Sequence, residues 1–398
     1  MQLQPDNNND WINQRDKNYL KYTSLASDNS VSSIFNSHAM GIITNRDPWV
    51  YGFDSSQVKK NVNKLISNYE NELKLTKLNP SYKPTRDEKK IKWTIDLERL
   101  FDKKIDIEFK NNKLKLALYR PFTKKWLYYD KNLVYAPGQY YTKWGDENKA
   151  IITTGTGGSK GFSTLVTNTI LDKQSLMNSQ GFMRYDNSAT KETELISKSN
   201  NNMNQKFADK LGLSLDDTFA YVYGLLNSKE YQEMYANDLK KDLARIPIVN
   251  NKETYVEVGK KLIDLHINYE EVPIYENVDI TTSGDVDYKV KKMKFAKKKD
   301  SETGKKVNDR STIIFNDSLS ISNIPKKAYE YIVNGRSAIE WIMDQYQVKT
   351  DKKSGIIDDP NDFSEDPKYI FNLLLRIINV SVQTVDLINQ LPPLALEK

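Results

Sequence analysis

The order of hydrophobic periodicities most constrains how this chain of 398 residues can fold. Apolar residues alternate, as they do in half-buried strands, mostly before residue 165 and again near 290–315. Helical spacing prevails between these regions and in the last part of the chain. Segregated strands and helices predict an α+β fold with a mixed β-sheet domain, packed helices and a C-terminal helical unit.

Breaks in these patterns divide the chain into three predicted parts. A chain of this length is long enough for two or three domains. Residues 1–85 are a polar lead-in with one helix, predicted from Ser55 to Leu78 because apolar residues recur there at helical spacing. Pro80 follows that helix and ends it. Residues 86–325 form the predicted α+β domain, and residues 326–398 the predicted helical unit.

Two stretches of the predicted α+β domain are expected to contribute strands to the same sheet system. We expect residues 86–165 and 286–316 to share a sheet system. The first stretch has a hairpin signal at Asn111-Asn112, since Asn tolerates positive φ. In the second stretch two strands flank a long Lys-rich loop, and the predicted strands are 286–295 and 311–315.

Helices are predicted where side-chain caps precede apolar residues at helical spacing. Ser214 and Ser228 can each cap a helix. Residues 187–210 resemble a surface loop, rich in Ser, Asn and Lys. We expect the helical tail, 326–391, to pack against the helices of 214–245. The predicted helices of the tail are Ala328–Val333, Ala338–Tyr346 and Pro367–Leu391.

The rarest residue types exclude several kinds of chemistry. The chain has no Cys, so a disulfide, a thiolate zinc site and a Cys nucleophile are impossible. Its two histidines, His38 and His266, exclude a His-rich metal site, and each is typical of a packing or surface residue. No Asn-Pro-Pro-Tyr or Asp-Pro-Pro-Tyr tetrad, helicase motif or nuclease motif is present. We therefore predict no catalytic and no metal-ligating residue in this chain.

Hydropathy predicts a protein of the cytoplasm without a membrane partner. No apolar run approaches the ~18 residues that a membrane span needs. The first residues, MQLQPDNNNDW, have neither the basic nor the apolar region of a secretory signal.

A glycine-rich stretch, Thr154–Gly161, invites a nucleotide-binding interpretation. The phosphate loop requires Gly before its Lys and Ser or Thr after it, whereas here Ser159 precedes Lys160 and Gly161 follows. The spacing fails, and a flexible turn after a strand is favoured. A phosphate contact through the backbone amides stays open.

The strongest physical signal is a basic run. From Lys289 to Lys299, seven of eleven residues are Lys, and none is acidic. Val290, Met293 and Phe295 interleave, so a strand could anchor by its apolar side and show Lys to a polyanion. An edge strand guarded by Lys against aggregation explains the run equally well.

A second basic cluster lies at residues 118–130, where Arg120, Lys124 and Lys125 stand among aromatic residues. Arg and aromatic side chains suit base edges, stacking and phosphates. The competing interpretation is a hairpin core in which Arg120 forms a structural ion pair.

These residues carry a resemblance to a known family. Tyr119-Arg-Pro-Phe122, followed by Trp-Leu-Tyr-Tyr-Asp130, is similar to the target-recognition region of large adenine-methylating restriction enzymes. Asn-Gly-Arg-Ser-Ala-Ile-Glu-Trp341 with Tyr-Gln-Val-Lys-Thr-Asp351 resembles the C-terminal end of single-polypeptide type I (type ISP) restriction–modification enzymes. Asn45-Arg-Asp resembles the junction after their methyltransferase core. One departure is Thr123-Lys-Lys125, where the family pattern has Asp-x-Arg.

The resemblance implies a recognition module without its own catalysis. Such a module reads a short asymmetric duplex-DNA site and positions an attached N6-adenine methyltransferase, together with a translocase and nuclease. S-adenosylmethionine, ATP and Mg²⁺ would then belong to upstream domains, and no cofactor to this chain. The candidate DNA-binding residues are Arg120, Lys124, Lys125, Lys143, Lys160, Lys291, Lys292, Lys294, Lys297, Lys298 and Lys299.

Two other functions remain open at this point. The chain could be a standalone enzyme that uses a nucleotide or S-adenosylmethionine through a divergent loop at 154–161. It could also be an inactive, truncated gene product.

Overall fold

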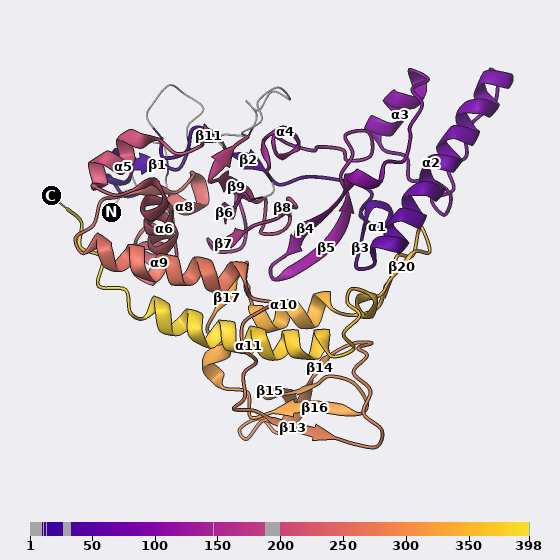
Figure 1. Ribbon diagram of the computed structural model, residues 1–398. Helices are drawn as coiled ribbons and strands as arrows, with labels where there is room; N and C mark the ends of the chain where they lie inside the picture. Colours follow the sequence, from indigo (N-terminus) through magenta and orange to yellow (C-terminus); the bar gives the residue numbers. More distant parts are fainter. Residues whose placement is uncertain are drawn as a thin grey trace.

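The computed structural model describes residues 10, 12, 14–26, 33–145, 147–187 and 200–397. It combines helices with several sheets, which confirms the α+β prediction. Figure 1 shows two long helices crossing the middle of the molecule, sheets on both sides of them, and an arm that projects from one end.

Two four-stranded sheets lie on one side of the long helices. One has the order β3 (Tyr51–Gly52), β5 (Thr123–Tyr128), β4 (Leu114–Arg120), β8 (Ile170–Leu171), and it is mixed because β8 runs parallel to β4. The other is antiparallel, in the order β2 (Ala39–Met40), β9 (Gln180–Met183), β6 (Ala150–Thr153), β7 (Thr164–Thr167). Every residue of β6 and β7 is buried.

The remaining strands form a third sheet and short pairs. The third sheet has the order β13 (Asp279–Thr282), β16 (Leu319–Ser322), β15 (Lys306–Ile314), β14 (Lys294–Lys299). The pairs are β1 (Thr23–Ser24) with β12 (Arg245–Ile246), β10 (Tyr185–Asp186) with β11 (Asn200–Asn201), β17 (Ile332–Val333) with β18 (Arg336–Ser337), and β19 (Lys349–Thr350) with β20 (Ile357–Asp358).

The helices follow the predicted pattern in most places. They are α1 (Asp47–Val50), α2 (Ser55–Leu78), α3 (Ile95–Asp102), α4 (Tyr140–Lys143), α5 (Gln205–Leu211), α6 (Leu215–Leu226), α7 (Lys229–Met234), α8 (Asp238–Lys241), α9 (Lys252–Ile267), α10 (Ala338–Gln345) and α11 (Tyr369–Ile388). Single 3₁₀ turns are η1 (Tyr19–Lys21), η2 (Asn111–Lys113), η3 (Lys326–Tyr329) and η4 (Pro360–Asp362). The predicted bounds of α2 are confirmed, and Ser214 and Ser228 cap α6 and α7 as expected.

The prediction of one shared sheet system is wrong. Strands β14 and β15 belong to the third sheet, and Figure 1 shows α10 and α11 between that sheet and β4–β5. The ring of Phe315, just after β15, packs edge-on against Phe371 of α11, with 5.4 Å between ring centroids. The apolar face of the third sheet is therefore buried against a helix, and no second sheet is required to cover it.

Three local predictions also need correction. Asn111 and Asn112 form a 3₁₀ turn, and the hairpin joins β4 to β5 instead, with Phe122 at φ 53° in its turn. The predicted Lys-rich loop is largely strand, since β14 and β15 leave only residues 300–305 between them. The predicted helix 328–333 is a 3₁₀ turn followed by a tight strand pair, whose Asn334-Gly335 turn has positive φ at both residues.

Several helices were not predicted, and one predicted loop is only partly described. Helix α3 interrupts the expected sheet, and helix α9 follows Pro247. Of the predicted loop 187–210, residues 188–199 lie outside the described part of the chain, and α5 forms its end.

Helix α9 lies between the C-terminal helix and the helices of 214–245. It crosses α6 so closely that a Cβ on Gly259 would lie 2.0 Å from the backbone oxygen of Ala220. On its other side it packs on α11. The tail therefore reaches α6 mainly through α9, and its end contacts the helices of 214–245 directly, since Lys229 Nζ of α7 lies 3.3 Å from Asn389 Oδ1.

Helix α11 is long and apolar enough to cross a membrane, judged by length and composition alone. The expectation that no segment would approach this length thus has one exception. Most of the helix is buried against α9, α10 and η3. Burial inside the fold accounts for its apolar composition.

One buried histidine joins three helices. His266 of α9 shares a hydrogen bond of 2.6 Å through Nδ1 with the hydroxyl of Tyr223 on α6. Its Nε2 lies 2.8 Å from Oγ1 of Thr384 on α11. Burial lowers the pKa of His266 to about 3, so the ring is neutral and structural.

Replacing Gly259 with Val should destabilise the protein by about 1–3 kcal/mol or more, because α6 and α9 must move apart. Gly161→Ala is the matched control, since no atom lies within 4 Å of the added Cβ. Urea unfolding of both variants measures the difference. Equal stability of the two variants would contradict the close helix crossing.

The stability of the protein should fall as the pH is lowered from about 6.5 toward 3. In that range the unfolded chain binds a proton at residue 266 that the folded protein excludes, which costs up to about 1.4 kcal/mol per pH unit. His266→Gln should remove this part of the pH dependence. Denaturant unfolding at several pH values compares the two proteins, and identical pH profiles would refute the role of the ring.

Candidate functional site

The β4–β5 hairpin presents three of the predicted site residues, and each is held by an acidic partner. Arg120 Nη1 lies 3.0 Å from Asp172 Oδ1. Lys124 Nζ lies 2.6 Å from a carboxylate oxygen of Glu270, directly after α9. The third residue, Lys125, lies 2.5 Å from Asp358 of β20. These pairs fasten the hairpin to three other parts of the chain.

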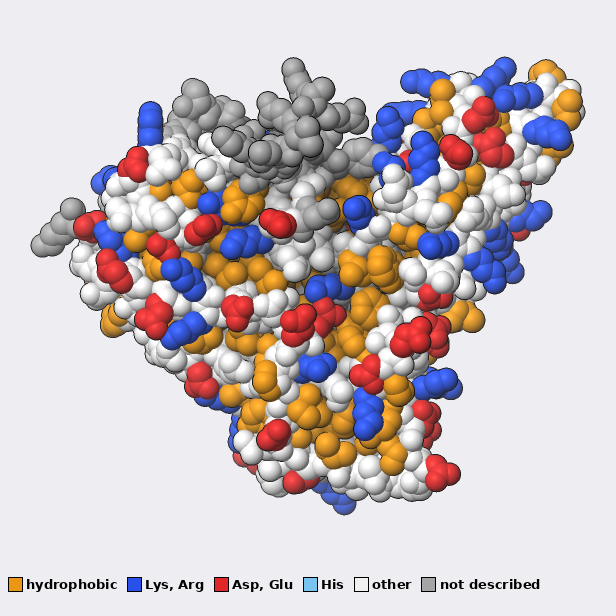
Figure 2. Space-filling view, viewed as in Figure 1, with side chains coloured by type: hydrophobic (Ala, Val, Ile, Leu, Met, Phe, Trp, Pro, Cys, Tyr) orange, Lys and Arg blue, Asp and Glu red, His pale blue; other side chains and the backbone are white. Residues whose placement is uncertain are grey.

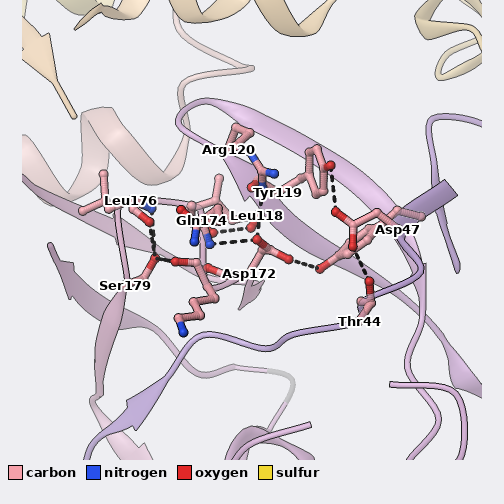
Figure 3. Close-up of polar contacts among 12 residues, drawn as sticks. Thr44, Asp47, Leu118, Tyr119, Arg120, Asp172, Gln174, Leu176 and Ser179 are labelled. Carbon is pink, nitrogen blue, oxygen red and sulfur yellow. Dashed lines mark hydrogen bonds and ion pairs between the residues drawn. The ribbon is translucent and has the colours of Figure 1, made fainter. Parts of the chain in front are cut away.

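Asp172 is the centre of the polar contacts drawn in Figure 3. Besides Arg120, its carboxylate accepts hydrogen bonds from the hydroxyl of Tyr51 at 3.3 Å and from the backbone nitrogen of Gln174 at 2.8 Å. Burial raises the pKa of the Asp172 carboxyl to about 6, against the opposing effect of the Arg120 guanidinium. The guanidinium also stacks on Tyr119, 3.9 Å from the ring centroid.

The Asn45-Arg-Asp47 segment joins the same network. The hydroxyl of Tyr119 donates to Asp47 Oδ2 at 3.0 Å, and Thr44 donates to the other oxygen of that carboxylate. The network thereby connects two motifs that lie more than seventy residues apart. Both carboxylates already bind donors of this network, so the cluster holds the structure together.

Arg46 is buried beneath this network. Its Nη2 lies 2.9 Å from Asp96 of α3, and burial lowers its pKa to about 10. Its Nε and Nη1 atoms have no hydrogen-bond partner within the described chain. The nearby indole nitrogen of Trp49 is buried without a partner as well.

Two adjoining cavities open around these motifs. The larger has a volume of about 450 Å³ and is lined by residues 42–49 together with Arg120, Asp172 and Lys173. The smaller, of about 260 Å³, lies between Tyr51, Tyr119 and the β19–β20 hairpin. Asp47, Pro48 and Asp351 line both cavities, so the two form one hollow.

The arm beside this hollow carries most of the excess positive charge. Residues 55–110, which include α2 and α3, contain fourteen Lys and Arg against nine Asp and Glu, within a chain whose net charge is only +6. Figure 2 shows the blue side chains gathered over this arm. Sequence reasoning missed it because the charges are dispersed over the whole segment and form no run. A segment-by-segment charge count would have found it.

The β19–β20 hairpin connects the arm to the Lys run. Lys353 Nζ lies 3.6 Å from Glu88 of the arm. On the other side, the backbone nitrogen of Val348 donates to the carbonyl of Lys291 at 3.1 Å. The arm, the hollow and the start of the Lys run therefore follow one another along one side of the molecule.

The Lys run is a strand with an apolar anchor. Val290 and Met293 are buried, and β14 is an edge strand of the third sheet. All six predicted site residues of this run have exposed side chains: Lys291, Lys292, Lys294, Lys297, Lys298 and Lys299. Two of them reach across to β15, Lys297 to Asn308 and Lys298 to Asp309. An edge position fits both interpretations of the run, phosphate contact and guard against aggregation.

The last two predicted site residues lie apart from this surface. Lys143 at the end of α4 pairs with Asp186 at 2.8 Å. Lys160 is exposed, and its Nζ lies 5.6 Å from the ring centroid of Trp341. The structure thus brings the residues near 120 together with the hollow, and leaves Lys143 and Lys160 elsewhere.

The glycine-rich loop does not cradle a phosphate in this structure. The amides of Thr154, Gly155 and Gly157 donate to the carbonyls of Ser163, Met177 and Lys240, at 2.8–3.0 Å. A Cβ on Gly155 would lie 2.3 Å from the carbonyl oxygen of Asn178, so close packing explains that glycine. Within the described residues, no group of His, Asp and Glu side chains is arranged to hold a metal ion.

Comparisons with solved structures find similar folds in much larger proteins. A nuclease-deletion mutant of the Type ISP restriction-modification enzyme LlaGI, in complex with a DNA substrate mimic, matches 99% of this chain at 42% identity and a TM-score of 0.86. The ATP-dependent Type ISP enzyme LlaBIII, bound to DNA, matches 99% at 39% identity and a TM-score of 0.89. The chain spans 30% and 26% of the lengths of those two chains.

A third structure shares the fold at lower identity. The DrdV–DNA complex matches the whole chain with a TM-score of 0.84 at 23% identity, over 41% of its own length. Among curated proteins none matches. The model of the Type ISP C-terminal specificity domain matches residues 33–373. That match, the fold and the shared motifs establish that this chain belongs to the family of Type ISP C-terminal specificity domains.

Proposed function

We propose that this chain is the module of a restriction–modification enzyme that recognises a specific sequence in duplex DNA. The observation that carries the proposal is its nearly complete match, at 42% and 39% identity, to one part of two Type ISP enzymes whose structures contain DNA or a DNA mimic. The module would position an attached N6-adenine methyltransferase, translocase and nuclease in the cytoplasm. S-adenosylmethionine, ATP and Mg²⁺ would be bound by those other domains.

The distribution of charge supports this proposal. Phosphate contacts supply most of the affinity of DNA-binding proteins, and base contacts supply the specificity. The basic arm of residues 55–110 and the exposed Lys run provide cations on one side of the molecule. Arg120, Lys124 and Lys125 are committed to ion pairs, so their part is to hold the hairpin that shapes this side. Lys143 is paired as well, whereas Lys160 has an exposed side chain that can approach a base or a phosphate.

The alternative of a standalone nucleotide-using enzyme lacks support. Its loop at 154–161 would have to offer free amides to a phosphate, and three of these amides already donate to backbone carbonyls. A truncated, inactive product would differ from the proposed module in one measurable way, since it would fold and yet fail to bind DNA.

Replacing Lys297, Lys298 and Lys299 with Ala should lower the affinity of the protein for cognate DNA and for random DNA by similar factors. The slope of log K against log salt should flatten by up to roughly 3 units if all three contact phosphates. Titration of labelled duplexes at several salt concentrations measures the slope. The matched control replaces Lys206, Lys210 and Lys252, from α5 and the start of α9. If β14 is only an edge guard, the slope will be unchanged and the triple variant will aggregate more.

The isolated chain should neither methylate DNA nor hydrolyse ATP. The physical reason is the occupied amides of the 154–161 loop and the lack of a catalytic tetrad in the sequence. Assays of methyl transfer to duplex DNA and of ATP hydrolysis with the pure chain test this expectation. Detectable turnover in either assay would support the enzyme alternative.

A further inference from the structure

Two residues that line the larger cavity have buried donors without a partner in the described chain. Arg46 is 1% exposed and Trp49 is 1% exposed, and both line this cavity of about 450 Å³. Three of their nitrogens, Arg46 Nε, Arg46 Nη1 and Trp49 Nε1, have no hydrogen-bond partner in the part of the chain that the structure describes. Buried donors without partners carry a free-energy cost, which a ligand rich in acceptor oxygens would remove.

A half-buried lysine lines the same cavity without a partner. Lys173 Nζ makes neither a hydrogen bond nor an ion pair with any described residue. On the opposite wall, Lys92 and Lys353 share one acid, since their Nζ atoms lie 3.0 Å and 3.6 Å from the same oxygen of Glu88. Lys173 is therefore a cation of this lining that has no ion-pair partner among the described residues.

Three acidic side chains that line the cavity already have ion-pair or hydrogen-bond partners. Asp172 is paired with Arg120, Asp47 accepts from Thr44 and Tyr119, and Asp351 accepts two hydrogen bonds from Ser354. Lys173 Nζ, the Nε and Nη1 atoms of Arg46 and the indole nitrogen of Trp49 lack partners in the described chain, whereas these carboxylates already accept hydrogen bonds. This arrangement favours a compact anion with several acceptor oxygens.

We propose that this cavity, at the base of the basic arm, binds a phosphate group. The inference rests on the proposed function in one respect, since it takes the phosphodiester backbone of DNA as the source. A nucleotide would present the same chemistry. The arm of residues 55–110 would then guide the same backbone toward the cavity by its excess positive charge.

The test uses Lys173→Glu, with Lys206→Glu on α5 as the control of equal charge change. Lys206 is exposed and lies on a helix at the other end of the molecule from the arm (Figure 1). Each variant is titrated with a labelled random duplex at several salt concentrations, and with ATP and inorganic phosphate by calorimetry. The milder variant Lys173→Gln and thermal melting show whether any loss comes from unfolding.

A loss of roughly tenfold in duplex affinity for Lys173→Glu, with a salt slope smaller by about 1, would support a DNA phosphate in the cavity. Loss of ATP or phosphate binding with unchanged duplex binding would support the phosphate site and assign it to a nucleotide. If Lys173→Glu behaves like Lys206→Glu in every titration, the inference is wrong. If the unaltered chain binds no DNA at all, the proposed function is wrong. The titrations with ATP and with inorganic phosphate then still show whether the cavity binds a phosphate group.

Discussion

The burial of α11 is the constraint on which the rest of the structure depends. This helix packs on α9, and through it on α6, while Phe371 contacts Phe315 and Tyr288 beside the third sheet. Its first residue, Tyr369, donates to the same Glu270 that holds Lys124 of the β4–β5 hairpin. Because a helix this apolar cannot face water, its partners on every side are fixed relative to one another. The three sheets thus become parts of one body without sharing a strand.

Because these elements are fixed relative to one another, the surface around the β4–β5 hairpin has a defined shape. The hairpin with Tyr119 and Arg120 is held by ion pairs to Asp172, Glu270 and Asp358, which come from distant parts of the sequence. These pairs close one wall of the hollow beside the basic arm. Most of the charged groups that line the hollow are held in ion pairs, whereas Lys173 has no ion-pair partner among the described residues. This division separates residues that shape the surface from residues that are free to contact a ligand.

The sequence predicted local structure well and long-range contacts poorly. The bounds of α2 and the caps at Ser214 and Ser228 were predictable because helical spacing and side-chain caps act within a few residues. The element that covers the third sheet was not predictable, since Phe371 of α11 lies more than fifty positions from Phe315, which it contacts. The motif residues Tyr119 and Arg120 indicated the β4–β5 hairpin from the sequence alone. No sequence pattern indicates that Arg120 pairs with Asp172. The charge of the arm was present in the sequence but dispersed over residues 55–110.

Selection from a pool of random duplexes tests the central claim most directly. The isolated chain is incubated with the pool near physiological salt, and bound duplexes are recovered, amplified and sequenced over several rounds. A sequence-recognition module should enrich one short asymmetric site, because base contacts add about 4–10 kcal/mol to non-specific phosphate binding in typical specific complexes. Recovery of duplexes without any enriched sequence would contradict the account, since it would leave a basic protein that binds DNA without reading it.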